Sequence, residues 1–172
     1  MWGRAGTMIR NKTDVAAAIC AAAFVVVLLV SAYWDRSIRV LHVFESLPYI
    51  AAAILCLRRS KVGYALGAAS GASWLWMAGF LTTFIRNGFQ RLFMLYHRGG
   101  VDRLDLLIAV PAAIATGGLL LFSVAGYARL PHKSWRDLGL LAAALVGVLL
   151  FFILIFAAFA PRYLAIFQRL IP

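Results

Sequence analysis

Five stretches of apolar residues are each long enough to cross a bilayer, and polar segments separate them. A helix needs about 20 apolar residues to cross the hydrocarbon core, where only helices or closed barrels satisfy every backbone hydrogen bond. The stretches are continuous rather than alternating, which argues against barrel strands. We therefore predict an all-α, polytopic membrane bundle that forms one domain over residues 1–172. The predicted spans are 15–34, 38–57, 62–84, 106–128 and 138–161.

Two further segments combine bulky apolar side chains with arginines at helical spacing. Residues 86–98 are predicted to form an amphipathic helix in the membrane interface, and the tail 162–172 is predicted to lie on the membrane too. A solvated charge run is the alternative for 86–98, but it would expose four bulky side chains. These side chains recur at i, i+3, i+4 and i+7 and are Phe89, Leu92, Phe93 and Tyr96. The cations assigned to anionic lipid headgroups are Arg86, Arg91 and Arg98.

The second span is the one in which polar and ionisable side chains share a helix face. At 100° per residue its polar residues fall within an arc of about 120°. Glu45 is the only glutamate of the chain, and at ~1.5 Å per residue it lies about 18 Å from the end of the span, near mid-bilayer. Pro48 predicts a kink beside it. This polar stripe consists of Asp35, Arg39, His42, Glu45, Ser46 and Tyr49.

Two interpretations of the polar stripe follow from the cost of burying a charge. That cost is at least about 2.5–3.5 kcal/mol, so Glu45 must be neutral, paired or beside water. In the structural interpretation Asp35 pairs with Arg39, and His42, Tyr49 or a hydroxyl group of another helix bonds Glu45, which fixes the helix register. In the functional interpretation Glu45 binds a proton, a cation or a ligand headgroup. A metal site is disfavoured, because one helix supplies only two or three ligands and no second histidine lies in a span.

The third span carries glycines at a four-residue spacing, which predicts a close helix contact. Small residues let two backbones approach, and dispersion then holds the helices together in lipid. The partner is either another helix of this chain or a second copy of it. The glycines of this face are Gly63, Gly67 and Gly71.

Composition and charge agree with a membrane protein. Hydrophobic residues make up 64% of the 172 positions, and the formal charge is +11. In a soluble protein such a charge suggests nucleic acid, but here the cations lie beside the spans, where they anchor helix ends and set orientation. We therefore expect no nucleic-acid partner. With five spans, nine cations fall on the side of the N-terminus and eight on the other, and the two short basic loops favour an inside N-terminus.

No enzyme motif is present in the chain, which lacks HExxH, GxSxG and the P-loop, and its two cysteines form no CxxC pair. We therefore predict a non-enzymatic, multi-pass protein of a bacterial-type inner membrane, without cofactor or metal. The favoured role is a scaffold or accessory subunit, which uses the glycine face to join other membrane subunits or a homo-oligomer. The alternative is a small proton- or ion-coupled transporter centred on Glu45.

Overall fold

The computed structural model describes residues 11–161, and these residues form helices without strands. The predicted all-α fold class is therefore confirmed. The predicted interfacial tail at 162–172 lies outside the described residues. In chain order the elements are α1 (Lys12–Trp34), the 3-10 turn η1 (Arg36–Ile38), α2 (Arg39–Leu57), α3 (Lys61–Trp76), the π-helical turn η2 (Met77–Leu81), α4 (Phe84–Arg98), the 3-10 turn η3 (Leu104–Ile108), α5 (Ala109–Ala128) and α6 (Trp135–Phe159).

Four segments are long and apolar enough to cross a membrane, and they match four of the predicted spans. They are Lys12–Trp34, Arg36–Leu57, Leu104–Ala128 and Trp135–Phe159. The predicted span 62–84 differs, because α3 has only 16 residues and continues as the five-residue turn η2. Helical structure stops there because Thr82 adopts an extended conformation, with φ −119° and ψ 164°.

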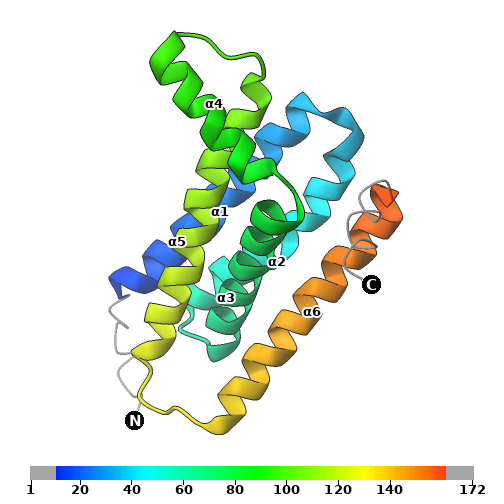
Figure 1. Ribbon diagram of the computed structural model, residues 1–172. Helices are drawn as coiled ribbons and strands as arrows, with labels where there is room; N and C mark the ends of the chain where they lie inside the picture. The colour runs from blue at the N-terminus through cyan, green and yellow to red at the C-terminus, as the bar shows by residue number, and fades with distance from the viewer. Residues whose placement is uncertain (1–10, 162–172) are drawn as a thin grey trace, which may run out of the picture.

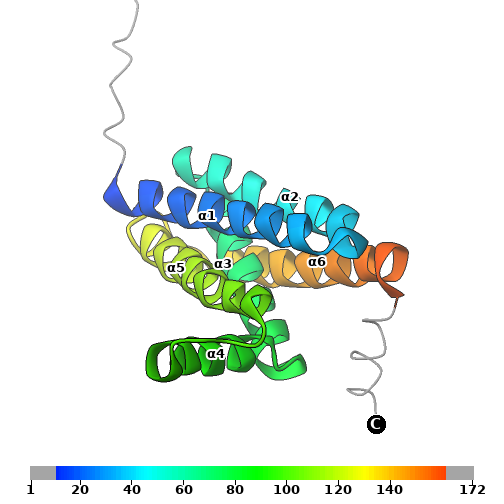
Figure 2. The same ribbon diagram turned by 90° about the horizontal axis from the view of Figure 1, so that it is seen from above.

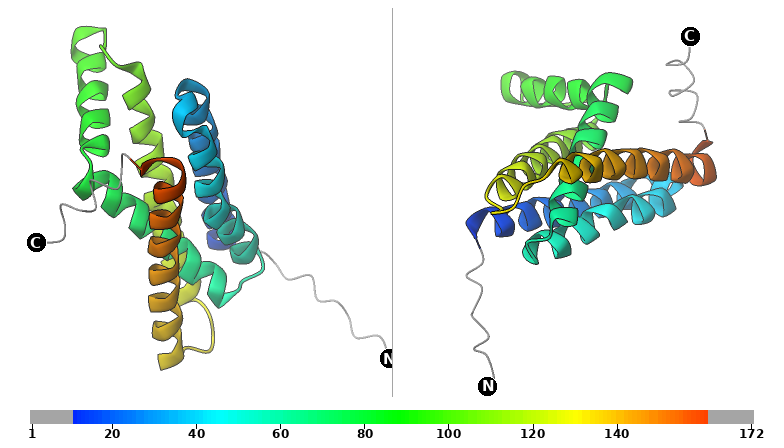
Figure 3. Two further views of the ribbon diagram at one scale, coloured as in Figure 1. Left: turned by 90° about the vertical axis from the view of Figure 1, so that its right-hand side faces the viewer. Right: turned by 90° about the horizontal axis from the view of Figure 1, so that it is seen from below.

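α3 is the central helix of the bundle. It packs against α2, α5 and α6, and most of its residues are buried. α1 packs against α2 and α5, whereas α6 contacts α3 and α2 (Figures 1 and 2). Much of the apolar surface of α6 is exposed. α4 lies beyond α5, on the side away from α2 (Figures 2 and 3). A short helix thus occupies the centre while the longest ones surround it.

The connections between helices gather at two ends of the bundle (Figure 1). We call the end that holds residues 11–14, 58–61 and 129–137 the basal end. The distal end holds the turn between α1 and α2, the turn η2, and α4 with the segment that leads into α5. The two ends differ in how their polar groups are paired.

A buried carboxylate joins three elements at the basal end. Asp14, near the start of α1, is 1% exposed, and its Oδ2 lies 3.1 Å from Nε of Arg59. Its Oδ1 accepts a hydrogen bond of 2.7 Å from the hydroxyl group of Tyr64 on α3. Nearby, the guanidinium of Arg129 donates to the side-chain oxygen of Asn11 at 2.9 Å. These bonds connect α1 to the α2–α3 loop, to α3 and to the end of α5.

A second carboxylate fastens α6 to the same end. Nζ of Lys61 lies 2.9 Å and 3.0 Å from the two carboxylate oxygens of Asp137, and the Tyr127 hydroxyl donates to Asp137 at 2.9 Å. Asp137 also accepts from the backbone N–H of Ser134, and together they form a capping box at the start of α6. Ion pairs and hydrogen bonds therefore connect all three basal segments.

The glycine face of α3 packs inside the chain. A Cβ atom at Gly63 would lie 2.5 Å from the Leu55 carbonyl carbon on α2. One at Gly71 would lie 2.8 Å from the Thr116 carbonyl oxygen on α5, and one at Gly67 would collide with the Ser123 hydroxyl. The close contact predicted from the spacing is present, and α2 and α5 supply it. No room is left on this face for a helix of another subunit, which corrects the expectation that the glycine face joins a larger assembly.

α4 runs across the direction of the four long helices (Figure 1). Gly88 lets it approach the start of α5 closely, because a Cβ atom there would lie 2.6 Å from Cβ of Ala109. Gly99 ends the helix with a positive φ of 68°, and its N–H donates to the carbonyl oxygen of Leu95 at 3.1 Å. The helix predicted at 86–98 is therefore present, with one end held against α5.

The apolar and cationic side chains of α4 are distributed as an interfacial helix requires. The four apolar side chains that recur at helical spacing are exposed, from 42% at Leu92 to 86% at Tyr96. Arg86 and Arg98 are exposed as well, whereas Nη2 of Arg91 lies 3.4 Å from the carboxylate of Asp102. Contact with lipid stays a prediction for this helix.

Candidate functional site

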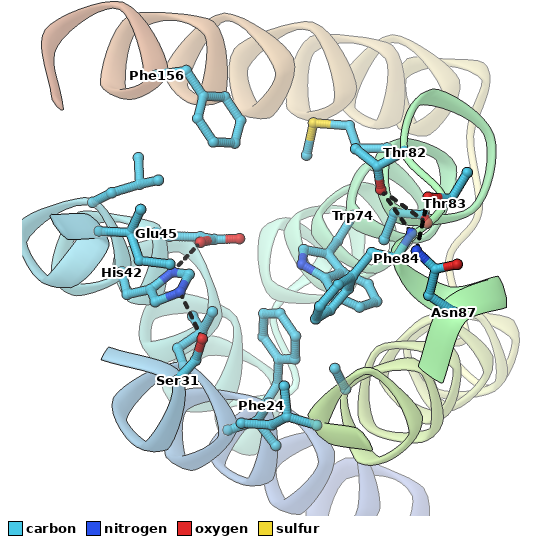
Figure 4. A pocket seen from close by; sticks show the side chains of 18 residues that line it. Phe24, Ser31, His42, Glu45, Trp74, Thr82, Thr83, Phe84, Asn87 and Phe156 are labelled. Atoms are coloured by element: carbon cyan, nitrogen blue, oxygen red, sulfur yellow. Dashed lines mark hydrogen bonds and ion pairs between the residues drawn. The ribbon is translucent and has the colours of Figure 1, made fainter. Parts of the chain in front are cut away.

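A cavity of about 350 Å³ lies inside the distal end, where α1, α2, α3, η2, α4, α5 and α6 all contribute to its wall (Figure 4). Its volume is at the lower end of the range for small-molecule sites. Most of the wall is apolar, and polar side chains occupy two opposite sides. The larger apolar residues of the wall are Phe24, Leu28, Trp74, Met77, Phe84 and Phe156.

One polar side of the cavity is the pair formed by His42 and Glu45. Nδ1 of His42 lies 2.8 Å from Oε2 of Glu45, and the two side chains are 12% and 6% exposed. Nε2 of His42 lies 3.1 Å from the hydroxyl group of Ser31 on α1. The i, i+3 spacing brings the two side chains together on α2, as the sequence predicts. Both ring nitrogens are engaged, so the imidazole can contact the carboxylate in either its neutral or its protonated form.

Two members of the polar stripe lie at the distal turn and not in the cavity. Asp35 accepts hydrogen bonds from the backbone N–H and the hydroxyl group of Ser37, at 2.9 Å and 2.6 Å. Nε of Arg39 donates to the carbonyl oxygen of Ala32 at 3.3 Å. These bonds shape the turn between α1 and α2. They are formed in place of the expected pairing of Asp35 with Arg39.

The other two members of the stripe take part in helix packing. Ser46 donates to the carbonyl oxygen of Val43 at 2.7 Å, rather than to that of Phe44, which Pro48 leaves without its helical partner. The Tyr49 hydroxyl donates to the carbonyl oxygen of Ser70 on α3 at 3.2 Å. Within the stripe, only the histidine and the glutamate line the cavity.

The opposite polar side of the cavity comes from Thr82, Thr83 and Asn87, which the sequence analysis missed. The Thr82 hydroxyl donates to the carbonyl oxygen of Ala78 at 3.2 Å, and Nδ2 of Asn87 donates to the Thr83 hydroxyl at 2.9 Å. These residues join η2 to α4. The signal that could have found them is the pair of adjacent threonines, which interrupts an apolar stretch just before an amphipathic helix begins.

The turn η2 widens the helix where it borders the cavity. The N–H of Thr82 donates to the carbonyl oxygen of Met77, five residues earlier, at 2.9 Å. Insertions of this π type into α-helices are frequent at functional sites. Met77 and Ala78 both line the cavity, so the distorted turn forms part of its wall.

Aromatic rings form a continuous part of the cavity wall. The rings of Phe24 and Trp74 meet edge to face with centroids 5.1 Å apart, and those of Trp74 and Phe84 do so at 6.3 Å. Figure 4 shows the Glu45 carboxylate pointing into the cavity toward these rings, with Phe156 on the neighbouring side. The carboxylate therefore faces aromatic side chains across an open space.

The ionisable groups of the cavity are few. Among the described residues that line it, Glu45 and His42 are ionisable, and none is a lysine or an arginine. Within residues 11–161, no three His, Cys, Asp or Glu side chains gather in a way that could hold a metal ion. The arrangement provides hydrogen bonding, a carboxylate charge and a titratable imidazole beside an apolar volume.

Comparison of the chain with protein-family models, curated proteins and solved structures gave no match. The function has to be inferred from the chemistry of the cavity.

Proposed function

We propose that this protein is a small ion-coupled carrier, in which the distal cavity binds a small, mostly apolar molecule and Glu45 binds its polar group. The observation that carries this proposal is a glutamate whose side chain is only 6% exposed and whose carboxylate faces a cavity of about 350 Å³. Ionisable groups are costly inside a membrane and typically mark the path of a substrate, an ion or a proton.

The hydrogen bonds of Glu45 favour a binding role over a role in joining helices. Oε2 contacts His42 on the same helix. In the described part of the chain no hydrogen bond engages Oε1, and Figure 4 shows this oxygen on the cavity side of the carboxylate. The link of this pair to a neighbouring helix runs through Nε2 of His42, which contacts Ser31 on α1, and not through the carboxylate itself. One oxygen of Glu45 is available to a ligand.

The alternative role, a scaffold or accessory subunit, depended on the glycine face of α3. Because α2 and α5 occupy that face, no described surface favours this role over the carrier. Other subunits, or a second copy of the chain, would have to bind through lipid-facing surfaces such as that of α6.

The membrane arrangement that we propose follows from the four apolar helices and the positions of the cations. α1, α2, α5 and α6 cross a bacterial-type inner membrane with the basal end inside, because the short basal loops are rich in lysine and arginine, and α3 with η2 leads the chain from the basal to the distal end inside the bundle. α4 then lies in the headgroup layer of the distal side. Its exposed arginines attract anionic lipids there.

Trp74 provides a direct test of ligand binding, because it lines the cavity while Trp76, two residues later, is 41% exposed. The probe is para-bromobenzyl alcohol, a neutral molecule whose bromine quenches tryptophan fluorescence on contact. We expect saturable quenching in nanodiscs of neutral lipid. The saturable part should disappear in Trp74→Phe and persist in Trp76→Phe.

A second pair of variants tests whether the binding occupies the cavity. Ala112→Phe fills space in the cavity wall, whereas Ile114→Phe alters a side chain on the same helix that is 68% exposed. Saturable quenching should be lost only in Ala112→Phe, with the helix content and melting temperature of both variants measured alongside. Quenching that rises linearly and equally in all variants would mean that the probe only dissolves in lipid, and would overturn the proposed function.

A further inference from the structure

We infer that the ligand of the distal cavity is an organic cation, an apolar amine or quaternary ammonium compound whose charged group contacts Glu45. This inference rests on the proposed function, since it takes the cavity as the binding site, and it adds the chemical class of the ligand. Charge, aromatic surroundings and the position of the neutral polar groups each support it.

The charge of the cavity selects against anions. Glu45 carries the carboxylate, His42 is titratable, and no lysine or arginine lines the described wall. An anion would meet a carboxylate of its own sign in an apolar volume, without a fixed cation to offset the repulsion. A neutral ligand would leave the charge of Glu45 compensated, among residues 11–161, by its contact with His42 alone. An ammonium group supplies the missing opposite charge at the available oxygen Oε1.

The aromatic wall adds attraction for the same kind of group. Rings of Phe24, Trp74 and Phe84 line the cavity in series, and Figure 4 shows them facing the Glu45 carboxylate across it. The negative face of an aromatic ring attracts ammonium groups, by up to about 2 kcal/mol when the site is desolvated. A carboxylate opposite aromatic rings is therefore suited to an alkylated or aryl amine.

The neutral polar groups indicate how the ligand is oriented. Thr83 and Asn87 are bonded to each other on the far side of the cavity and offer hydroxyl and amide groups without charge. They can bind a hydroxyl or ether group of the ligand but cannot neutralise an ammonium. The charged end then lies at Glu45 and the tail points toward α4.

Protonation of Glu45 opposes cation binding, so affinity falls as the pH is lowered. The residues that line the cavity from α1, α3, η2, α4, α5 and α6 are uncharged. On α2 itself, Arg39 and Tyr49 flank the pair toward the distal and basal sides, and Asp35 precedes the helix. None of these three lines the cavity, so Glu45 and His42 are the ionisable groups that border the ligand within the described wall.

The experiment compares three probes of equal size that differ in charge: para-bromobenzylamine, para-bromobenzyl alcohol and para-bromobenzoate. Quenching of Trp74 is measured in nanodiscs of neutral lipid, so that the membrane charge does not concentrate the amine. We expect the amine to bind at least about tenfold more tightly than the alcohol at neutral pH. The benzoate should give no saturable quenching.

Two substitutions test whether Glu45 causes the preference for the amine over the alcohol. Glu45→Gln keeps the shape and should remove most of the preference for the amine, leaving the part that the aromatic rings contribute. Asp35→Asn removes another carboxylate next to the same helix, outside the cavity, and should leave the preference unchanged. If Glu45→Gln does not fold, the wild-type protein still tests the idea, because the amine should lose affinity as the pH falls while the alcohol does not.

The outcomes separate this inference from the proposed function. Saturable binding of the alcohol with no preference for the amine would overturn the inference and leave the carrier proposal standing. A preference for the amine that stays undiminished in Glu45→Gln, or fails to decline at low pH, would also overturn it. Absence of saturable quenching by every probe would overturn both.

Discussion

Each end of the bundle contains a buried carboxylate, and the two are bonded in different ways. Asp14 at the basal end is 1% exposed, and both of its oxygens are bonded, one by an arginine of the α2–α3 loop and the other by a tyrosine of α3. Glu45 at the distal end is 4% exposed, and its bond to His42 lies within α2. The first carboxylate faces protein on all sides and the second faces a cavity.

This difference indicates which buried carboxylate stabilises the fold and which is available for function. A permanent cation and a hydroxyl group hold Asp14 in place, so it fixes α1 relative to α3. Glu45 contacts His42, an ionisable residue on the same helix. Its carboxylate can therefore exchange this partner for a ligand at little cost to the tertiary structure. Burial alone does not separate these two roles, whereas the number and origin of the partners do.

The largest expected effect tests whether the α2–α3 contact at the basal end leaves less room than the turn η2 at the distal end. Gly63→Ala would place a Cβ atom 2.5 Å from the backbone of Leu55, and a backbone atom cannot easily move. We expect a loss of about 3 kcal/mol of stability, since overpacking costs of this order occur in well-packed cores. The matched control is Gly79→Ala in η2, where the nearest atom outside its own helix is Ile85 Cδ1 at 3.8 Å. Thermal unfolding of both variants in detergent measures the difference, and equal melting temperatures would contradict the contrast between the ends.

The next effect concerns the basal carboxylate itself. Asp14→Asn removes the charge that pairs with Arg59 and should cost about 2 kcal/mol, less than the full penalty for a broken buried pair because Arg59 is partly exposed. The matched substitution Glu45→Gln at the distal end should cost much less. Both can be compared by the same unfolding measurement. Equal losses would mean that the two carboxylates play the same structural part.

The sequence predicts the distal pair but not the basal one, and the reason is the distance along the chain. His42 and Glu45 are three residues apart, so helical periodicity alone brings them together. Asp14 finds its partners at positions 59 and 64, and nothing local indicates that those segments meet. Apolar length predicts the spans in the same local way, since a stretch of about 20 apolar residues needs no partner to be recognised.

The cavity also escapes prediction, for a conformational reason. Its far side forms because η2 ends before Thr82, where the backbone becomes extended. In the apolar pattern of residues 62–84, the two threonines are the only sign that the helix ends there. The sequence does not determine which helix packs against the glycine face, for a similar reason. Four-residue spacing predicts a close approach, but only tertiary contacts show that α2 and α5 make it.

A smaller effect is expected from the arginines of α4, which extend the distal end into the predicted headgroup layer. Arg98→Gln should weaken attraction to anionic lipid by about 1 kcal/mol, and this loss should shrink as salt is added. The control is Arg91→Gln, because Arg91 already contacts Asp102 and should contribute less. Melting temperature in nanodiscs with and without anionic lipid measures the contribution of lipid. If anionic lipid stabilises the wild type and both variants equally, α4 does not lie in the headgroups as proposed.

The smallest effect on stability, and the largest on function, is expected at Glu45. Glu45→Gln keeps the volume and most hydrogen bonding, so it should lower the free energy of unfolding by less than about 1 kcal/mol.

A single carboxylate that holds either a proton or an organic cation exchanges one for the other. In liposomes with a trapped pH dye, para-bromobenzyltrimethylammonium added outside should therefore make the lumen alkaline as protons leave. This cation is permanently charged, so it does not carry protons across the lipid by itself. Glu45→Gln should abolish the response, and Asp35→Asn should keep it. A full response in Glu45→Gln would show that the exchange does not use Glu45. If the folded wild-type protein gives no response although the cation binds at Trp74, the distal cavity is a binding site but not part of a carrier.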